Sequence, residues 1–280
     1  MKKSTSQEIK DFISKPLFDE KIILNQDPSW PKISIITLSY NQAEFLERTI
    51  LSVLNQNYPS LEYIIIDGGS KDRSVEIIKK YNKYITRWIS EPDGGIADAF
   101  NKGVKLVSGD WINFMNAGDY FFSDNTLKTI SAIIGKLNEE YKIISGFAVS
   151  QQFRMPKQIL NNNMPIFEKA MLAHQATFFN RTLFRKYGLF DKKYKLRMDF
   201  EFLVRILRTE KFKFTEQNIC VYDLHGISTK YPFGMMLEQL KIELAYSKKL
   251  TYILKLIFVF NFYCAILCLR EIKRKLFKTP

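Results

Sequence analysis

The feature that most constrains the fold is an alternation of short apolar runs with helical patterns between residues 33 and 116. The apolar runs are rich in β-branched side chains, which is typical of strands buried on both faces of a parallel sheet. The runs cover residues 33–39, 63–67, 85–90 and 111–116, and segments with apolar residues at helical spacing cover residues 44–55, 74–84 and 96–107. This alternation predicts an α/β fold with a mostly parallel central sheet flanked by helices.

The second half of the chain is less regular. Residues 142–150 are predicted as a further strand, and residues 151–170 as a loop over an acceptor groove. Residues 182–188 and 198–209 carry helical patterns.

Polar residues follow the end of each strand predicted in the first half. In chain order they are Tyr40 and Asn41, then DGGS (67–70), EPDGG (91–95) and NAGD (116–119). In parallel sheets of this kind, ligands bind in the crevice beyond the carboxyl ends of the strands. Four separate strand ends therefore predict one polar crevice.

Two acidic residues near these ends are candidates for nucleotide binding. Asp67 precedes two glycines in a turn where the backbone can approach a ligand closely, and its carboxylate suits a base edge or a ribose hydroxyl. Asp98 faces the crevice if Ile96 and Phe100 face the core. Each also has a simpler role, because an Asp stabilises a turn and favours the first turn of a helix.

Asp119, with Asn116 three residues before it, is the candidate metal site. Mg²⁺ and Mn²⁺ typically take only one or two carboxylates, together with phosphate oxygens and water. Asp119 and a neighbouring amide oxygen are enough for such an ion, which would stabilise a departing nucleotide diphosphate. An ordinary turn aspartate is the alternative.

The segment RMDFEFLVRIL contributes two further carboxylates, Asp199 and Glu201. Residues two apart on a helix point to different faces, so only one of them can face the site. A direct displacement needs one carboxylate to take the proton of the acceptor hydroxyl. Asp199 is the predicted base. Glu201, which is assigned to the acceptor side, or Arg205 is expected to contact the acceptor or to hold the loop.

Six segments together resemble the large inverting family-2 glycosyltransferases, which have the GT-A fold. They are PKISIITLSYN, TILSVLNQ, YIIIDGGSKD, SEPDGGIADAFNKG, SGDWINFMNAGD and MDFEFLVR, in consistent order over residues 32 to about 210. The resemblance is greatest to the bacterial branch that builds capsule, exopolysaccharide and O-antigen units. The usual DxD-type motif reads NAGD here and keeps only its last Asp.

The resemblance implies roles for individual residues. Nucleotide-sugar binding falls to residues at the strand ends, Asp119 ligates Mn²⁺ or Mg²⁺, and Asp199 is the base. His174 corresponds to an acceptor-side histidine, and His225 is a candidate third metal ligand, although a structural histidine is the alternative at both positions. The nucleotide-sugar-binding candidates are Thr37, Tyr40, Asp67, Gly69, Glu91, Asp98 and Asn116.

Charge is unevenly distributed along the chain. Residues 1–125 carry 15 Lys and Arg against 17 Asp and Glu, whereas residues 126–280 carry 27 against 12. An anionic partner of the second half is one explanation, and a lysine-rich proteome is another. Nucleic acid is not expected as the partner, because no RRM, KH or helix-turn-helix pattern is recognisable.

The C-terminal segment 250–269 is strongly apolar, but Lys255 and Asn261 interrupt it and the basic segment REIKRKLFK follows. We expect a helix lying on or dipping into an anionic leaflet, and a core or dimer helix is the alternative. The odd number of cysteines and the polar N-terminus, which lacks a secretory pattern, favour the cytoplasm, at the inner face of the cytoplasmic membrane.

These observations predict three parts. Residues 1–31 form an N-terminal arm, residues 32–230 the transferase domain, and residues 231–280 a helical tail. Within the domain, residues 32–125 are expected to bind a nucleotide-sugar donor, with UDP as the expected nucleotide, and residues 126–230 to bind a glycan or polyprenyl-linked glycan acceptor. A non-catalytic protein that binds an anionic ligand, or a degenerate transferase-like subunit, is the alternative function.

Overall fold

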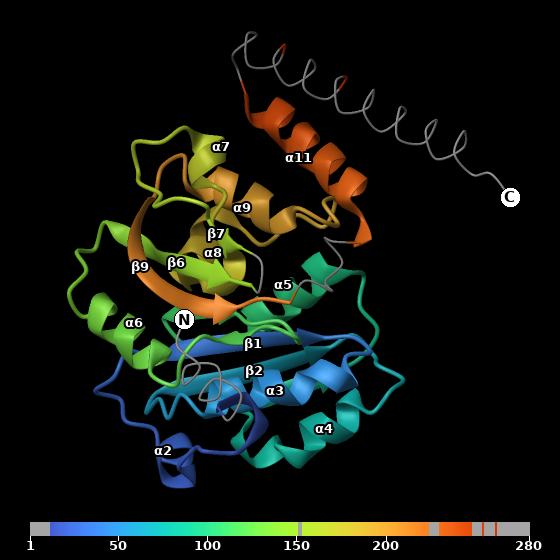
Figure 1. Ribbon diagram of the computed structural model, residues 1–280, viewed down its shortest axis with the longest axis vertical. Coiled ribbons are helices and arrows are strands. Elements are labelled where there is room, and N and C mark those ends of the chain that lie inside the picture. Colours follow the sequence, from blue (N-terminus) through green and yellow to red (C-terminus); the bar gives the residue numbers. More distant parts are fainter. Residues whose placement is uncertain (1–11, 151–152, 224–229, 248–253, 255–260, 262–280) are drawn as a thin grey trace, which may run out of the picture. The chain divides into compact units, whose positions relative to one another are not determined.

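The computed structural model describes residues 12–150, 153–223, 230–247, 254 and 261. The chain divides into two compact units, Met1–Tyr231 and Pro232–Pro280. In the described part of the first unit, one mixed sheet has the strand order β3-β2-β1-β4-β8-β6-β9-β5, with β7 paired to β6 (Figure 1). The strands are β1 (Ile33–Ser39), β2 (Leu61–Asp67), β3 (Arg87–Ser90), β4 (Trp111–Phe114), β5 (Tyr120–Phe121), β6 (Tyr141–Val149), β7 (Arg154–Met155), β8 (Thr177–Asn180) and β9 (Lys211–Val221).

The first four strands of this order are parallel, as the sequence predicts. The helices α3 (Ala43–Leu54), α4 (Ser74–Lys80) and α5 (Ile96–Leu106) connect them along the chain. All seven residues of β2 and all four of β4 are buried, which explains why these strands are apolar without alternation.

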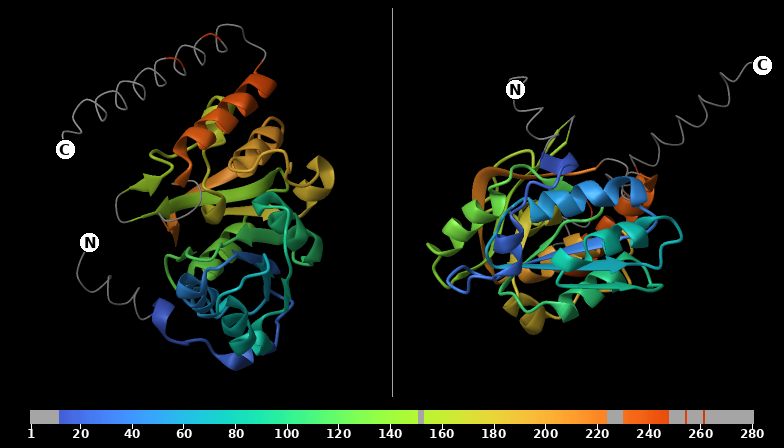
Figure 2. Two further views of the ribbon diagram at one scale, coloured as in Figure 1. Left: turned by 90° about the vertical axis from the view of Figure 1, so that its right-hand side faces the viewer. Right: turned by 90° about the horizontal axis from the view of Figure 1, so that it is seen from below.

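Helices cover both faces of this parallel half (Figure 2). Ile33 and Ile35 belong to the same buried cluster as Ile50 of α3. Ile36 points to the opposite face, where Gly103 of α5 packs so closely that an added Cβ would lie 2.6 Å from the Ile36 side chain. The close approach of α5 therefore depends on a glycine.

The other half of the sheet is mostly antiparallel and curls. β8 runs antiparallel to both β4 and β6, and β9 is parallel to β6 with several shifts of register. Such irregularities bend a strand, and β9 is strongly curved in Figure 1. The curl pairs the end of β9 with β5, so that Val221 lies opposite Tyr120.

The other helices of this unit whose bounds lie within the described residues are short. They are α2 (Glu20–Leu24), η1 (Asn82–Tyr84), α6 (Thr126–Ile134), α7 (Ile166–Lys169), η2 (His174–Ala176), α8 (Thr182–Tyr187) and α9 (Met198–Ile206). The predicted helices at 182–188 and 198–209 correspond to α8 and α9. The predicted loop 151–170 contains β7 and α7, while β5, β8, β9 and α6 were not predicted.

The segment before β1 packs against the domain instead of leading away from it. Phe12 and Ile23 are buried in the core. The Asn55 side chain donates hydrogen bonds to the carbonyls of Phe12 and Lys15 and accepts one from the Leu17 N–H. These apolar residues are too widely spaced to produce a periodic signal, so the sequence suggested only a polar arm.

The described part of the second unit is the helix α11 (Pro232–Tyr246). Apart from residues 254 and 261, the apolar segment 250–269 lies outside the described residues. Within the part of the chain that the structure describes, no helix has the length and hydropathy needed to cross a membrane.

Candidate active site

The ends of β1, β2 and β3 meet at Asp67. In the sheet, Asp67 pairs with Ser39 on one side and with Ser90 on the other. The Asp67 carboxylate is buried and accepts hydrogen bonds from the backbone N–H groups of Gly69 and Ser70 and from the hydroxyls of Ser70 and Ser90. Gly69 adopts φ +80°, which a side chain would strain. Asp67 thus fixes the turn at these strand ends.

Two further side chains converge over this turn. A Cβ added to Gly68 would lie 2.6 Å from the Asp93 carboxylate and 3.3 Å from the Tyr40 ring. The Tyr40 side chain is 61% exposed, which is unusual for a ring of this size. An exposed aromatic face beside a carboxylate suits a planar, hydrogen-bonding ligand. Asp93 lies in the EPDGG segment but is not one of the predicted site residues.

Asp98 lies at the start of α5 and is surrounded by positive charge. It accepts a hydrogen bond from the Gly94 N–H, forms an ion pair with Lys192, and lies 3.8 Å from Lys102. The Lys192 ammonium and the Gly94 N–H hold the pKa of the Asp98 carboxyl below its usual range. Lys102 also pairs with Glu91 at 2.7 Å, so Glu91 joins the same charged group.

Two predicted site residues have other contacts. Thr37 is fully buried, and its hydroxyl lies 3.0 Å from the Tyr63 hydroxyl, so this side chain links β1 to β2. Glu201 is also buried, and Arg205 donates two hydrogen bonds to its carboxylate. Because Arg205 also donates to the carbonyls of residues 187 and 189, Glu201 and Arg205 together hold the loop after α8.

A second cluster forms where β4 ends. Asn116 Nδ2 lies 3.2 Å from His174 Nε2, and His174 Nδ1 lies 2.9 Å from Asp199 Oδ2. Burial raises the pKa of Asp199, but the hydrogen bond and charge of His174 outweigh it, so the net effect lowers this pKa to about 2. Asp199 is therefore ionised at neutral pH.

The sheet topology explains why these three residues meet. β8 runs antiparallel to β4, so η2, which precedes β8, lies beside the end of β4. The Asn113 side chain of β4 donates hydrogen bonds to the carbonyls of Gln175 and Thr177 and fixes this turn. Asp199 comes from the first turn of α9, which packs Phe202 against Phe184 with ring centroids 4.8 Å apart.

Asp119 lies in the turn after β4 and is buried. Its carboxylate accepts a hydrogen bond from the Asp223 N–H, a contact that the β5–β9 pairing creates. Burial raises the pKa of Asp119 to about 6. Arg48 of α3 donates hydrogen bonds to the Gly118 carbonyl and to the Asp223 carboxylate, at 2.7 and 3.1 Å.

The end of β1 joins the two clusters. The Ser39 carbonyl accepts a hydrogen bond from Gly68 N–H, and the Leu38 carbonyl accepts one from Ala117 N–H. The Asp67 turn and the Asn116–Asp119 turn therefore flank one strand end. The predicted convergence of separate strand ends is present in the described residues.

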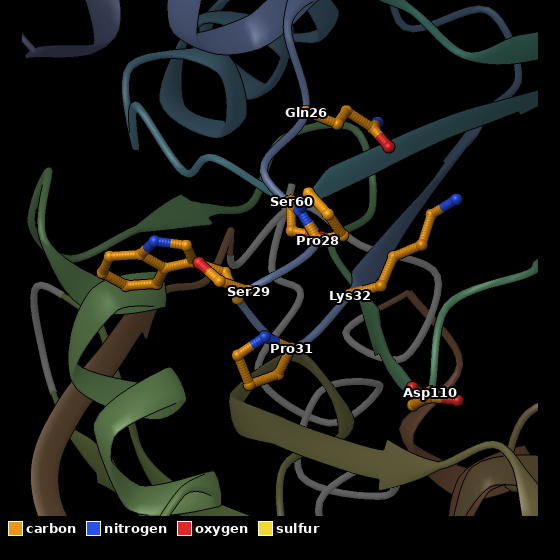
Figure 3. Close-up of a pocket in the computed structure, with 8 residues that line it drawn as sticks. Gln26, Pro28, Ser29, Pro31, Lys32, Ser60 and Asp110 are labelled. Carbon is orange, nitrogen blue, oxygen red and sulfur yellow. The ribbon is translucent and has the colours of Figure 1, made fainter.

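A separate open groove lies at the other end of the parallel strands, where their amino ends are. It has a volume of about 670 Å³, and Lys32, Ser60 and Asp110 line it just before β1, β2 and β4 begin (Figure 3). None of the predicted site residues lines it. The groove is therefore distinct from the candidate active site.

Comparison with known proteins shows the family. The family model described as glycosyl transferase family 2 matches residues 34–197. The chain belongs to glycosyl transferase family 2. An uncharacterized glycosyltransferase of Mycobacterium tuberculosis is 31% identical over 209 residues, which cover 72% of this chain and 78% of that protein. A PGL/p-HBAD biosynthesis glycosyltransferase of Mycobacterium bovis is 29% identical over 180 residues, covering 62% and 69%.

Solved structures share the fold of this family-2 glycosyltransferase. The mannosyltransferase PcManGT from Pyrobaculum calidifontis, in complex with GDP-Man and Mn²⁺, matches with a TM-score of 0.64 at 16% identity, covering 90% of this chain and 75% of that one. TarS from S. aureus, in complex with UDP-GlcNAc, matches with a TM-score of 0.62 at 17% identity, covering 80% and 70%. The expected GT-A fold is confirmed.

The donor atoms of this glycosyltransferase fit a divalent cation at Asp119. Asn116 Oδ1 is a buried oxygen without a hydrogen-bond partner, and it lies in the same turn as the buried Asp119 carboxylate. Hard oxygens of these two kinds are the ligands that Mg²⁺ and Mn²⁺ prefer. Within the described residues, no group of three or more His, Cys, Asp or Glu side chains could hold a metal ion. The other proposed ligand, His225, lies outside those residues.

Sequence reasoning missed two residues of this glycosyltransferase site, Arg48 and Asp223. Asp223 is two residues before His225, and Arg48 lies in α3 immediately before the segment TILSVLNQ. Neither carries a motif signal of its own. Asp223 reaches Asp119 because the curled β9 returns to β5, and Arg48 reaches the same turn from α3.

Proposed function

We propose that the chain transfers a sugar, with inversion, from a nucleotide-diphospho-sugar to an acceptor hydroxyl. The observation that carries this proposal is an ionised carboxylate, Asp199, held by His174 beside the strand end that bears Asp119. A base and a candidate cation ligand in one crevice are the two groups that a direct displacement needs. UDP is the proposed donor nucleotide.

The donor would occupy the ends of β1 to β4. The exposed Tyr40 ring offers a face for the base, and the neighbouring Asp93 carboxylate offers a hydrogen-bond acceptor. The Asp67 turn supports both from below. Lys102 and Lys192, which pair with Glu91 and Asp98, offer two ammonium groups that a diphosphate would contact.

Asp119, with the amide oxygen of Asn116, would hold Mn²⁺ or Mg²⁺. The ion supplies charge stabilisation to the diphosphate as it leaves. Arg48 and the Asp223 N–H hold the Asp119 turn in place, so the protein side of the site is ordered before the donor arrives.

The chemical step is a single displacement. The acceptor oxygen forms a bond to the anomeric carbon as the bond from that carbon to the diphosphate oxygen breaks. The bonding electron pair leaves with the nucleoside diphosphate, and the hydroxyl proton passes to the Asp199 carboxylate. Attack opposite the leaving group inverts the anomeric configuration.

The proposed acceptor is a glycan, linked to a polyprenyl carrier, in the synthesis of a surface polysaccharide. The basic second half of the chain and the apolar-then-basic segment after residue 250 favour an anionic, membrane-associated acceptor. The name of the mycobacterial relative, PGL/p-HBAD biosynthesis glycosyltransferase, also refers to a biosynthetic role. The site of action would be the inner face of the cytoplasmic membrane.

A screen of nucleotide sugars tests the donor side. With Mn²⁺ present, the cognate donor is expected to raise the melting temperature most, because it binds only the folded state. Transfer to glycan acceptors is then followed by NMR of the product. The signal of the anomeric proton is expected to show that the configuration at the anomeric carbon is inverted. Retained configuration would contradict the mechanism. Salt-dependent anion binding without turnover would favour the non-catalytic alternative, and donor binding without turnover the degenerate subunit.

The membrane proposal has its own test. A chain lacking residues 250–280 is compared with the full chain in flotation with anionic vesicles. The full chain is expected to float and the truncated chain to remain in solution. Equal flotation of the two chains would contradict a membrane role for this segment.

A further inference from the structure

The side chain of Asn101 forms two hydrogen bonds with the backbone of a single residue in the loop 188–197. Asn101 lies in α5 and is only 4% exposed. Its Nδ2 donates to the Phe190 carbonyl, and its Oδ1 accepts from the Phe190 N–H, both at 2.9 Å. α5 lies in the part of the chain predicted to bind the donor, whereas the loop lies in the part predicted to bind the acceptor. One buried amide therefore connects the two parts.

The Phe190 ring adds to this attachment. Its centroid lies 5.1 Å from that of Phe100 in α5 and 5.5 Å from that of Phe114 in β4. Arg205 of α9 holds the loop from its other side by hydrogen bonds to two backbone carbonyls. The loop is thus fixed beside α5 at Phe190.

Lys192 follows two residues after this attachment and returns to the same helix. Its ammonium pairs with Asp98 Oδ1, and Asp98 lies three residues before Asn101, on the neighbouring turn of α5. Asp98 also accepts the hydrogen bond from the Gly94 N–H, in the segment that follows β3. The Lys192 ammonium therefore lies at the strand ends where the donor is proposed to bind.

The Lys192 ammonium can contact a second anion while it pairs with Asp98. The side chain is 61% exposed, and an ammonium carries three N–H donors, so donors remain for a phosphate oxygen. The charged group around it consists of Asp98 and Glu91 with Lys102 and Lys192. Without Lys192 this group would carry a net negative charge, which disfavours a diphosphate.

We propose that Asn101 is a positioning residue for the donor: by holding the Phe190 backbone against α5, it places the Lys192 ammonium where it donates to the diphosphate. A loop from the acceptor part of the chain then completes the donor site. This inference rests on the proposed function, because it concerns the same donor.

Titration calorimetry of the full-length chain with UDP and with uridine, both with Mn²⁺ present, tests the contact of Lys192. Lys192→Gln should raise the Kd of UDP on the order of tenfold, because a hydrogen bond between charged groups is lost, and should leave the Kd of uridine unchanged. Lys193→Gln is the matched control, since Lys193 pairs with Asp191 at 2.8 Å, and it should change neither Kd. An unchanged UDP Kd in Lys192→Gln, or equal weakening of UDP and uridine, would overturn the proposal.

Asn101→Ser tests the positioning. The shorter side chain loses both hydrogen bonds to Phe190, so the UDP Kd should rise about 2- to 10-fold, because the loop must be ordered on binding. In the Lys192→Gln chain the same substitution should change the UDP Kd by less than about twofold, because Asn101 acts through Lys192. Asn101→Thr, which fills more of the buried volume, is measured in the same way in case Asn101→Ser does not fold.

A merely structural role for Asn101 predicts a different result. The melting temperature of the Asn101 variants would fall while their UDP Kd at a temperature where they are folded would stay at the wild-type value, which would overturn the proposal. Equal weakening of UDP binding with and without Lys192 would overturn it as well. Wild-type protein that binds neither UDP nor GDP would refute the proposed function together with this inference.

Discussion

His174 Nδ1 lies 2.9 Å from Asp199 Oδ2, although the two residues are 25 positions apart in the chain. One comes from the turn before β8 and the other from the first turn of α9. Their contact converts an ordinary helix-start aspartate into an oriented carboxylate whose pKa is lowered to about 2, because the hydrogen bond and charge of His174 exceed the effect of burial.

Asp199→Asn removes the proposed base while keeping the side-chain shape. We expect kcat to fall by about 100- to 10,000-fold, since a positioned general base contributes rate enhancement of that order. Donor binding, measured by thermal shift with UDP-sugar and Mn²⁺, should be retained. Asp110→Asn, in the groove at the amino ends of the parallel strands, is the matched control and should retain activity. Near-normal turnover of Asp199→Asn would exclude it as the base.

Asp119→Asn tests the cation site. The variant should lose the part of the UDP-dependent thermal stabilisation that requires Mn²⁺, because the neutral amide is a much weaker ligand for a hard cation. Chelation of the metal should reduce the wild-type stabilisation to the level of the variant. If wild type and variant respond equally to Mn²⁺, the ion binds elsewhere.

Arg48→Lys tests whether the bracing of the Asp119 turn matters. Lysine carries the charge but is the shorter side chain, so its ammonium would not reach the position of Arg48 Nη2, which donates to both the Gly118 carbonyl and the Asp223 carboxylate. We expect the apparent Mn²⁺ affinity to fall about tenfold, within the range for groups that support a metal site. Arg73→Lys, on an exposed surface of the first unit, provides the comparison and should leave the affinity unchanged. Equal affinities in both variants would refute the bracing role.

Glu62→Gln tests whether the charge of a buried carboxylate outside the candidate active site stabilises the folded protein. Burial would raise the Glu62 pKa, but hydrogen bonds from Ser108, Ser34 and the Gly109 N–H outweigh it and hold the pKa below its ordinary value of 4.5. The ionised form is thus favoured by folding. Its stabilisation is present above pH 4.5 and is lost as the pH falls through the lower, folded-state pKa.

At pH 7 the free energy of unfolding of the variant should therefore be about 1–3 kcal/mol lower than that of the wild type, since an amide N–H₂ would face hydrogen-bond donors. Urea unfolding at several pH values should show this difference shrinking below pH 4.5. The exposed Glu76→Gln should be nearly neutral throughout. A difference that does not depend on pH would show that the Glu62 charge is not responsible.

The sequence alone determined the parallel half of the fold and the strand ends that carry Asp67, Asp98 and Asp119. Buried parallel strands need continuous apolar runs, and such runs remain visible without knowledge of their neighbours. Once the apolar runs mark the ends of the strands, the polar residues that directly follow each strand are located as well.

Only the tertiary structure decided which side chains meet. The pairing of β8 with β4 set His174 beside Asn116, and the curl of β9 set Asp223 beside Asp119 and within reach of Arg48 of α3. The tertiary structure likewise buries Thr37, which contacts Tyr63, and Glu201, which contacts Arg205. These contacts join residues far apart in the chain through strands whose short or half-exposed patterns carry little local signal, so the three-dimensional pairing alone could reveal them.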